Sequence, residues 1–362
     1  MQPLTDWSSA RAVLCVRLDT IGDVIMTTPA LQALKQSLPG RRLTLLTSSQ
    51  GAAVAPLVPE VDDVIVYDAP WLKATPARAD ALADFAMIQH LRSRAFDAAA
   101  IFTVYSQNPL PSALLCYLAG IPLRLAHCRE NPYQLLTHWV HESEPEQGVR
   151  HECRRQLDLV EAAGCPAPDH PMSLAFSGAA RLRIQSLLRS LRVDLAEPWA
   201  VVHPGASAPS RRYPPEHFAE VVSLLRAAGW SVLVTGSEDE RPLAESVGGI
   251  SLAGLLSLDE MAALLHAAPL LISNNTGPVH MAAALGTPVV DLYALTNPQH
   301  TPWQVPHRVL NFDVPCRNCY RSVCPHGHHD CLRRVEPREV FDATLALYGE
   351  TGAAARSVEV LR

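Results

Sequence analysis

Lysine is nearly absent from this chain of 362 residues, because Lys35 and Lys73 are the only lysines among its 30 basic residues. The 36 acidic residues outnumber the basic ones, and the formal charge is −6 at pH 7. A chain of this charge has no global attraction to nucleic acid or to anionic lipid, so such a partner would need a local cationic patch. We therefore expect no nucleic-acid partner.

Long apolar runs and an export signal are also lacking. No uninterrupted apolar stretch approaches the ~20 residues of a membrane helix, since His266, Pro269 and Asn274 interrupt the most hydrophobic region. The first residues, through Asp6 and Trp7, contain no apolar segment of signal-peptide length. Five of the nine cysteines are scattered singly, at positions 15, 116, 128, 153 and 165, which fits a reducing compartment. These absences predict a soluble cytoplasmic protein.

The hydrophobic pattern predicts an α/β protein with two doubly wound, Rossmann-like domains and largely parallel sheets. Apolar strands are expected at 12–18, 43–46, 64–67, 98–104 and 123–126, and again at 200–203, 231–235, 270–273 and 289–293. Helical patterns at 24–38, 81–94, 112–118, 151–163, 179–191, 216–228, 243–247, 258–267, 278–285 and 338–347 separate or follow them. We divide the chain into 1–190, 191–336 and a terminal helix and tail at 337–362.

The loop Asp19-Thr20-Ile21-Gly22-Asp23 follows the first strand and opens the next helix. In a parallel sheet such a loop lies at the carboxyl edge, where ligands bind. Gly22 allows a tight turn, and the backbone N–H groups after it can hold an anion. Asp23 has two interpretations: a helix N-terminal residue stabilised by the helix dipole, or a general base.

Two further loops lie at expected strand ends. His203-Pro204-Gly205-Ala206-Ser207 precedes Arg211 and Arg212, whose charges suit the diphosphate of a leaving nucleotide, although such a pair is more often solvated surface. Ser273-Asn274-Asn275-Thr276-Gly277-Pro278-Val279-His280 offers backbone N–H groups and the Thr276 hydroxyl to a phosphate. The alternative for this loop is a well-formed helix start, with Pro278 in the first turn and His280 packed inside.

Taken together, the motifs resemble glycosyltransferase family nine, the heptosyltransferases. The resemblance rests on Ile21-Gly22-Asp23-Val24 with Thr28-Pro29-Ala30-Leu31, on His203-Pro204-Gly205-Ala206, and on the run from Asn274 to Ala284. Three separated matches in order are far more specific than one loop. The family implies the GT-B fold: an acceptor-binding amino-terminal domain and a nucleotide-sugar-binding carboxyl-terminal domain, facing across a cleft.

The resemblance also implies inverting transfer of a heptose from ADP-heptose to a lipopolysaccharide inner-core or related glycan acceptor, without a catalytic cofactor. Asp23 would be the general base and Arg211 would stabilise the diphosphate. The donor would be bound by Gly22, Ser207, Arg212, Asn275, Thr276, Gly277, His280 and a ribose-binding glutamate, Glu238 or Glu240. Two departures weaken the donor assignment: Asn275 replaces a frequent aspartate, and Arg211 replaces a frequent lysine.

Four cysteines are concentrated in one segment, 316–331, as Cys316-x-x-Cys319-x4-Cys324-x6-Cys331. Four thiolates suit a tetrahedral structural zinc or iron ion. Reduced thiols in a compact loop, or a disulfide formed on oxidation, are the alternatives. We interpret the segment as stabilising a loop and not as catalytic.

The acceptor is the least visible partner. An anionic lipid-linked acceptor would need cations on the first domain, and the candidates are arginines 41, 42, 92, 94, 124 and 129, which are more often part of a solvated face. Contact with the inner membrane would then be peripheral, through this acceptor. Alternative functions are transfer of another nucleotide sugar or to a protein acceptor, sugar-nucleotide epimerisation, and nucleotide-sugar binding without turnover.

Overall fold

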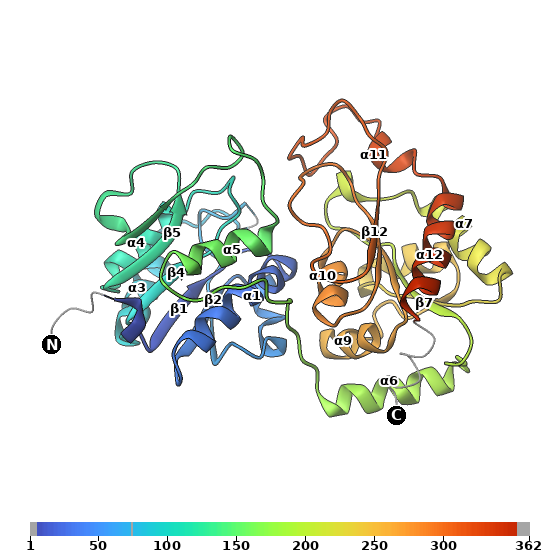
Figure 1. Ribbon diagram of the computed structural model, residues 1–362, viewed down its shortest axis with the longest axis horizontal. Helices are drawn as coiled ribbons and strands as arrows, with labels where there is room; N and C mark the ends of the chain where they lie inside the picture. Colours follow the sequence, from blue (N-terminus) through green and yellow to red (C-terminus); the bar gives the residue numbers. More distant parts are fainter. Residues whose placement is uncertain (1–5, 74, 353–362) are drawn as a thin grey trace. The chain divides into compact units, whose positions relative to one another are not determined.

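The computed structural model describes residues 6–73 and 75–352 of the chain (Figure 1). The chain divides into two compact units, Met1–Ser173 and Leu174–Arg362, each built on its own parallel six-stranded sheet. The division falls earlier than the expected boundary after residue 190. Helix α6 (Gly178–Ser190) is the reason, because it packs against α9 of the second unit and Ser177 at its start donates two hydrogen bonds to Asp259.

The first unit has the strand order β3-β2-β1-β4-β5-β6, and all neighbouring strands are parallel. The strands are β1 (Ala12–Val16), β2 (Arg42–Thr47), β3 (Asp63–Val66), β4 (Ala98–Ile101), β5 (Leu123–Cys128) and β6 (His138–His141). The helices are α1 (Ile21–Ser37), α2 (Ser49–Ala52), α3 (Leu82–Ser93), α4 (Leu110–Leu118) and α5 (Glu152–Glu161). Helix α1 packs against α5, and α3 packs against α4.

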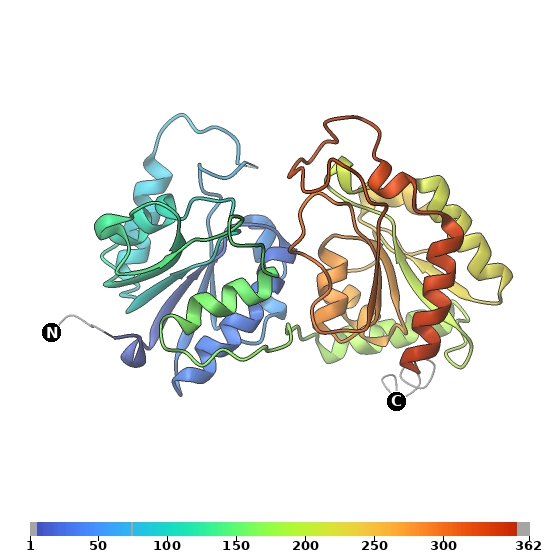
Figure 2. The same ribbon diagram turned by 45° about the horizontal axis from the view of Figure 1, so that its top comes forward.

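The second unit repeats this topology with the order β12-β11-β10-β7-β8-β9. Its strands are β7 (Trp199–His203), β8 (Ser231–Val234), β9 (Ile250–Ser251), β10 (Leu271–Asn274), β11 (Val289–Leu292) and β12 (His307–Leu310). Besides α6, its helices are α7 (Pro215–Ala227), α8 (Arg241–Val247), α9 (Leu258–Ala267), α10 (Gly277–Ala284), α11 (Asp330–Arg333) and α12 (Pro337–Thr351), with single turns at Pro209–Arg211 and Glu238–Glu240. Within this unit α12 packs against α7, and α10 against α9 (Figure 2).

Both sheets therefore have the doubly wound strand order. The first three strands of each unit are added toward one edge of the sheet, and the last three are added toward the other edge, starting beside the first strand. The switch points between these two directions lie between β1 and β4, and between β7 and β10. Loops that leave the carboxyl ends of two such strands diverge and form a crevice. The predicted α/β fold class with two Rossmann-like sheets is confirmed.

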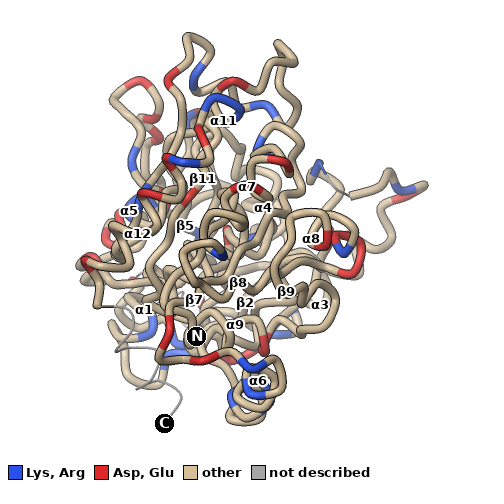
Figure 3. The backbone as a smooth tube through the Cα atoms, turned by 90° about the vertical axis from the view of Figure 1, so that its right-hand side faces the viewer, with Lys and Arg blue, Asp and Glu red and all other residues tan. Residues whose placement is uncertain are grey.

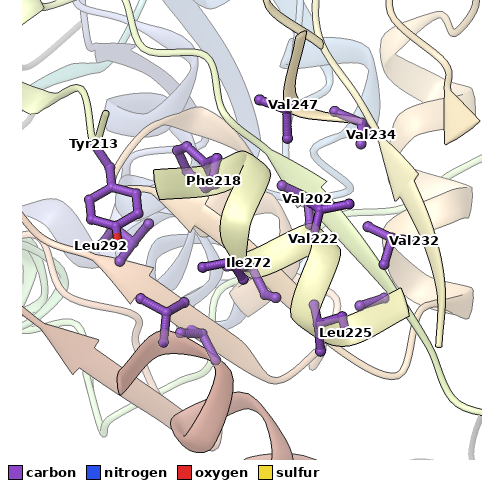
Figure 4. Close-up of a cluster of buried hydrophobic side chains, with 14 of the residues drawn as sticks. Val202, Tyr213, Phe218, Val222, Leu225, Val232, Val234, Val247, Ile272 and Leu292 are labelled. Atoms are coloured by element: carbon purple, nitrogen blue, oxygen red, sulfur yellow. The ribbon is translucent and has the colours of Figure 1, made fainter. Parts of the chain in front are cut away.

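The core of the second unit shows why the sequence folds this way (Figure 4). Strands β7, β8 and β10 are apolar runs that are buried on both faces, as expected for parallel strands covered by helices. Helix α7 begins with Pro215 in its first turn and buries Phe218, Val222 and Leu225 against the sheet. Phe218 also meets the Tyr213 ring edge to face, with 5.1 Å between centroids.

Three strands were not predicted: β6, β9 and β12. Strands β6 and β12 are only partly buried, and β9 has two residues, so none of them has the continuous apolar run that marks a central strand. All three lie at the edges of their sheets. The predicted terminal helix is present and extends through Thr351, whereas residues 353–362 of the predicted tail lie outside the described residues.

Charged residues of both signs are distributed along the chain, and the charged residues of α6 are all arginines, seen as blue stretches of its tube (Figure 3). Its arginines are partly occupied within the second unit, because Arg183 lies 3.7 Å from Glu260 and Arg181 lies over the Phe176 ring. Across residues 6–73 and 75–352, no helix combines the length and the apolar character needed to span a membrane.

Phe218→Ala is expected to lower the free energy of unfolding by about 3–5 kcal/mol, because it removes a fully buried ring and leaves a cavity under α7. Urea unfolding followed by tryptophan fluorescence measures the change. Leu182→Ala on α6 is the control, since Leu182 is 67% exposed and should change stability by no more than about 0.5 kcal/mol. Equal effects of the two substitutions would contradict this view of the core.

Candidate active site

Arg17 is the centre of the site in the first unit. It follows β1 directly, its side chain is completely buried, and its guanidinium meets three carboxylates: Asp19 at 3.3 Å, Asp23 at 3.1 Å and Glu152 at 3.1 Å. Burial opposes the charge, but the carboxylates outweigh it and hold the pKa of Arg17 above its ordinary value. The arginine therefore joins the end of β1 to the start of α1 and to α5.

Asp23 occupies the third position of α1 and closes a reciprocal cap with Thr20. Its Oδ2 accepts hydrogen bonds from the Thr20 backbone N–H at 3.0 Å and from the Thr20 hydroxyl at 2.7 Å, while Oδ1 accepts one from Arg17. The helix-start interpretation of Asp23 thus describes a real role. It does not exclude the second one, because a carboxylate has about four acceptor positions.

Asp19 is a second carboxylate at the same edge, which the sequence did not single out. Its Oδ1 accepts a hydrogen bond of 2.6 Å from the Gln107 amide, and this bond crosses the switch point between the loops after β1 and β4. Burial raises the pKa of Asp19 to about 6, with Asp23 and Glu152 adding to the shift and Arg17 and Gln107 opposing it. This carboxyl titrates close to neutral pH.

A cavity of about 760 Å³ opens beside this cluster, within the first unit. Asp19 and Thr20 line it, together with the polar side chains of Ser49, Asp68 and Asn108. Its apolar lining comes from Val16, Leu18, Trp71, Leu72, Pro76, Phe102 and Pro111. A cavity of this size accommodates a small-molecule ligand or part of a larger one.

The arginines considered for an anionic acceptor are largely occupied elsewhere. Arg41 is buried and donates to the carbonyl oxygens of Trp7, Ala10 and Leu34, and Arg124 donates to carbonyl oxygens that include those of Gln134 and Leu135. Arg92 and Arg129 also donate to backbone carbonyls, Arg94 pairs with Asp63, and Arg42 is exposed. Of the six candidates, Arg41 and Arg124 are therefore buried and bonded to backbone carbonyls, whereas Arg42, Arg92, Arg94 and Arg129 are exposed.

In the second unit, Asn274 at the end of β10 bridges the switch point. Its Nδ2 donates to the Pro204 carbonyl at 2.7 Å, and its Oδ1 accepts from the Tyr213 backbone N–H at 2.9 Å. The segment between Pro204 and Tyr213 carries the two predicted arginines. Arg212 is exposed but donates from Nε to the Ala206 carbonyl, whereas Arg211 is partly buried in a single helical turn.

The remaining predicted donor residues lie around the same sheet edge. Ser207 is exposed, Thr276 caps α10 in an extended conformation, and Gly277 is the first residue of that helix. The ring of His280 is buried and lies edge to face with that of His300, with 6.4 Å between centroids. The N-terminus of α10 thus faces the carboxyl end of the sheet, as a phosphate-binding helix requires.

The two candidate glutamates differ in their surroundings. Glu238 is exposed and pairs with Arg241 at 2.5 Å. Glu240 accepts a hydrogen bond from the Ser237 backbone N–H, and its carboxylate packs so closely on Gly205 that a Cβ at that position would lie 2.1 Å from Oε1. Glu240 is therefore committed to the loop, and Glu238 is the more accessible of the two.

Asn275 is held inside the unit by two acceptors. Its Nδ2 donates to Asp291 Oδ2 at 2.9 Å and to the His300 carbonyl at 2.8 Å, so contact with a sugar hydroxyl is left to its Oδ1. Asp291 is fully buried on β11, and burial raises its pKa well above the ordinary value, with the Asn275 hydrogen bond opposing the shift. An aspartate at 275 would place a second carboxyl against this one.

The four clustered cysteines line one small cavity of about 20 Å³, together with His328 and His329. Cys316 Sγ lies 3.7 Å from His328 Nε2. Among the described residues, no group of three or more histidine, cysteine or acidic side chains is arranged to hold a metal ion. The segment is bonded to the single helical turn Pro209–Arg211, here called the arginine turn. The Ser210 backbone N–H and hydroxyl donate to the carbonyl oxygens of Ser322 and Arg321.

The sequence did not single out Arg17, the centre of the first site, or four further residues. Asp19 and Gln107 follow predicted strands, and this position is the signal that could have found them. Asp291 is a charged residue inside an apolar strand, which is also visible in the sequence. Glu152 gave no signal, because its role depends on α5 packing against α1.

Two Rossmann-like units with polar loops at the carboxyl edges of their sheets define the class: the GT-B fold of glycosyltransferases. Residues 85–329 match the family described as glycosyltransferase family 9 (heptosyltransferase). The chain belongs to this family and is a glycosyltransferase.

Individual relatives agree with this assignment. The lipopolysaccharide heptosyltransferase 1 of Pseudomonas aeruginosa is 27% identical over 341 residues, which cover 91% of this chain and 90% of that protein. The solved structure of a family 9 glycosyl transferase from Veillonella parvula has a TM-score of 0.78 at 20% identity, covering 96% of this chain and 99% of that one. The E. coli ADP-heptose lps heptosyltransferase II has a TM-score of 0.72 at 23% identity, with coverage of 94% and 99%.

Asn275→Asp should destabilise the second unit by about 1–3 kcal/mol at neutral pH, since it exchanges the hydrogen-bond donor to Asp291 for a second carboxyl. The double variant with Asp291→Asn should recover most of the loss, because it restores one carboxyl and one amide. Chemical unfolding of the wild type, both single variants and the double variant forms the complete cycle. Additive effects would contradict direct coupling.

Asp291→Asn should also change the pH dependence of stability. The unfolded chain releases this proton near pH 4, whereas the folded chain retains it, so the wild-type free energy of unfolding falls by up to about 1.4 kcal/mol per pH unit above that point. The asparagine variant lacks this contribution and should gain relative stability between about pH 5 and pH 7. A difference that is constant with pH would show that Asp291 ionises normally.

Proposed function

We propose that this glycosyltransferase moves a heptose from ADP-heptose to a lipopolysaccharide-core or related glycan acceptor, with inversion at the anomeric carbon. The observation that carries the proposal is the position of Asp23 at the carboxyl edge of the first sheet, bonded to Thr20, which lines the cavity. The donor assignment draws on the E. coli relative, whose description names ADP-heptose. The acceptor assignment draws on the lipopolysaccharide named for the Pseudomonas relative.

In this reaction an acceptor hydroxyl oxygen forms a bond to the anomeric carbon while the bond from that carbon to the diphosphate oxygen breaks. Asp23 takes the hydroxyl proton as general base. The Arg17 guanidinium and the Thr20 hydroxyl fix the orientation of its carboxylate, so little reorganisation is needed when the proton arrives. The departing electron pair remains on the nucleoside diphosphate.

The second unit would bind the donor. The N-terminus of α10, with Thr276 and Gly277, suits the phosphates, and Arg211 would offset the charge that develops on the leaving diphosphate. Ser207, Arg212 and His280 lie on or beneath the same edge. Gly22, expected to allow a tight turn, is instead the buried second residue of α1 and has no positive φ. Glu238 is our choice for the ribose hydroxyls, because it is exposed, whereas the Glu240 carboxylate is bonded to Ser237 and packs on Gly205.

We place the enzyme in the cytoplasm, where ADP-heptose would be available, with peripheral contact at the inner membrane through its acceptor. The alternatives predict different products: an epimerase would convert the nucleotide sugar without an acceptor, and a binding protein would release no ADP. Incubation with donor alone, followed by mass spectrometry, separates these functions from transfer.

Asp23→Asn should reduce transfer by about 10²–10⁴-fold while donor affinity changes little, because the amide retains an acceptor for the Thr20 cap but is no base. ADP release and donor calorimetry measure the two quantities. Asp342→Asn on α12 is the control, since its carboxylate is 57% exposed and lies far along the chain from the proposed base. Transfer within threefold of the wild type would remove Asp23 from the mechanism.

The chemistry of its four thiols suits the cysteine segment to a structural zinc or iron ion, and all four line one cavity, although in the described residues they are not arranged around a single ion. Cys316, Cys319, Cys324 and Cys331 would hold the ion, and the segment would then fix Ser210 beside Arg211. Metal analysis of protein purified with and without oxygen should find about one ion per chain, and Cys324→Ser should lower both metal content and thermal stability. Stable, metal-free protein with four reduced thiols would contradict the proposal.

A further inference from the structure

The first-unit cavity is lined by more negatively charged side chains than positively charged ones. Among the described residues that line it, Asp19 and Asp68 carry carboxylates and Lys73 carries the one ammonium group. Asp68 accepts hydrogen bonds from the Ser49 backbone N–H and hydroxyl, and these bonds hold its pKa below the ordinary value, so it is charged throughout the neutral range. Arg17 is fully buried behind Asp19 and is not part of the lining.

Lys73 can offset one of these two carboxylates, and the neighbouring Arg78 does not offset the other. Arg78 is the nearest arginine in the sequence to Asp68, and it pairs with Asp84 and donates to the Asp68 backbone carbonyl. A carboxylate or phosphate of a ligand placed in the cavity would therefore meet two like charges and one opposite charge, so the lining keeps an excess of one negative charge.

The rest of the lining suits a polyhydroxylated ligand. Hydroxyl and amide groups line much of the cavity, and they belong to Ser48, Ser49, Gln50, Thr75, Thr103, Gln107, Asn108 and Ser112. The Trp71 ring is 36% exposed and is supported edge to face by Tyr67, with 5.8 Å between centroids, so it offers a fixed apolar surface. An aromatic surface beside carboxylates and amides matches a sugar, which has an apolar ring face and hydroxyls around its edge.

We propose that this cavity binds an uncharged sugar unit of the acceptor, with Asp19 accepting a hydrogen bond from one of its hydroxyls, Gln107 bonding an adjacent hydroxyl, and Trp71 covering its ring. The inference rests on the proposed function, because it assigns the cavity to the acceptor. Any phosphate or acidic sugar of the acceptor lies outside the cavity. Asp19 thereby contributes to acceptor binding, whereas Asp23 remains the base.

The geometry of Asp19 supports this division of roles. Gln107 already meets its Oδ1 across the switch point, and Arg17 lies nearer its Oδ2, so the carboxylate is fixed in position at the cavity wall. The charged groups that face it are Arg17 from the end of β1, Asp23 from α1 and Glu152 from α5. Because the pKa of Asp19 is about 6, acceptor affinity should increase as the pH is raised through about 6 and Asp19 becomes a carboxylate that accepts the hydrogen bond.

The first experiment measures sugar binding without donor. Saturation-transfer NMR with the full-length protein compares methyl glycosides of neutral hexoses and heptoses with the matched hexuronic acids and sugar 6-phosphates. Neutral sugars should bind at least tenfold more tightly than their anionic counterparts, and Trp71→Ala should weaken the neutral sugars at least tenfold. Equal or tighter binding of the anionic sugars, or no sugar binding at all, would overturn the inference.

The second experiment tests the source of the discrimination. Asp19→Asn and Asp68→Asn should each narrow the ratio between neutral and anionic sugars, and Asp19→Asn should raise KM for the acceptor more than it lowers kcat. Asp63→Asn is the control, because Asp63 pairs with Arg94 outside the cavity lining. If Asp19→Asn fails to fold, Asp68→Asn and Gln107→Ala carry the test, and an unchanged ratio in both overturns the inference.

The two proposals fail in different ways. If neutral sugars bind in the cavity but no nucleotide sugar is consumed with any acceptor, the proposed transfer is wrong and the inference about the cavity stands. If transfer occurs with equal efficiency to neutral and anionic sugar units, the transfer is right and the charge preference is wrong.

Discussion

The buried guanidinium of Arg17 is the interaction on which the first unit depends. Three carboxylates surround one cation, so the cluster would carry an excess of two negative charges if every acid were ionised. Burial, with the charges of Asp23 and Glu152 adding to it and Arg17 opposing it, raises the pKa of Asp19 to about 6 and places a titrating group at the cavity wall. Without the arginine, three carboxylates would remain in a poorly solvated site, which costs about 3–5 kcal/mol when one partner of a buried pair is lost.

At the corresponding edge of the second sheet, the polar side chains form a network of neutral groups and not a cluster of charges. Asn274 bridges the loops after β7 and β10, and Asn275 joins Asp291 to the His300 carbonyl. Burial favours the protonated form of Asp291, so this network carries no excess charge of its own. An uncharged network beneath the N-terminus of α10 leaves the electrostatic attraction for a phosphate to the helix and to the arginine turn.

The structure bears on two expectations drawn from the sequence, one about Asn275 and one about a cationic surface for the acceptor. Asn275 was a departure that weakened the donor assignment, and in the structure its amide donates a hydrogen bond to the buried Asp291. Two of the six arginines considered for a cationic acceptor surface do not contribute to one, since the guanidinium groups of Arg41 and Arg124 donate to backbone carbonyl oxygens. Arginine content alone could not distinguish a binding surface from internal bracing.

The sequence by itself determined the two doubly wound sheets, most strand and helix positions, and the loops at the strand ends where ligands bind. These features follow from apolar periodicity and from local turn residues, which act over a few neighbouring positions. Only the tertiary structure decided which charges meet, where the cavity lies and which helix belongs to which unit. Arg17 and Glu152, or Asn275 and Asp291, become partners through packing of separate elements, and no local pattern records that packing.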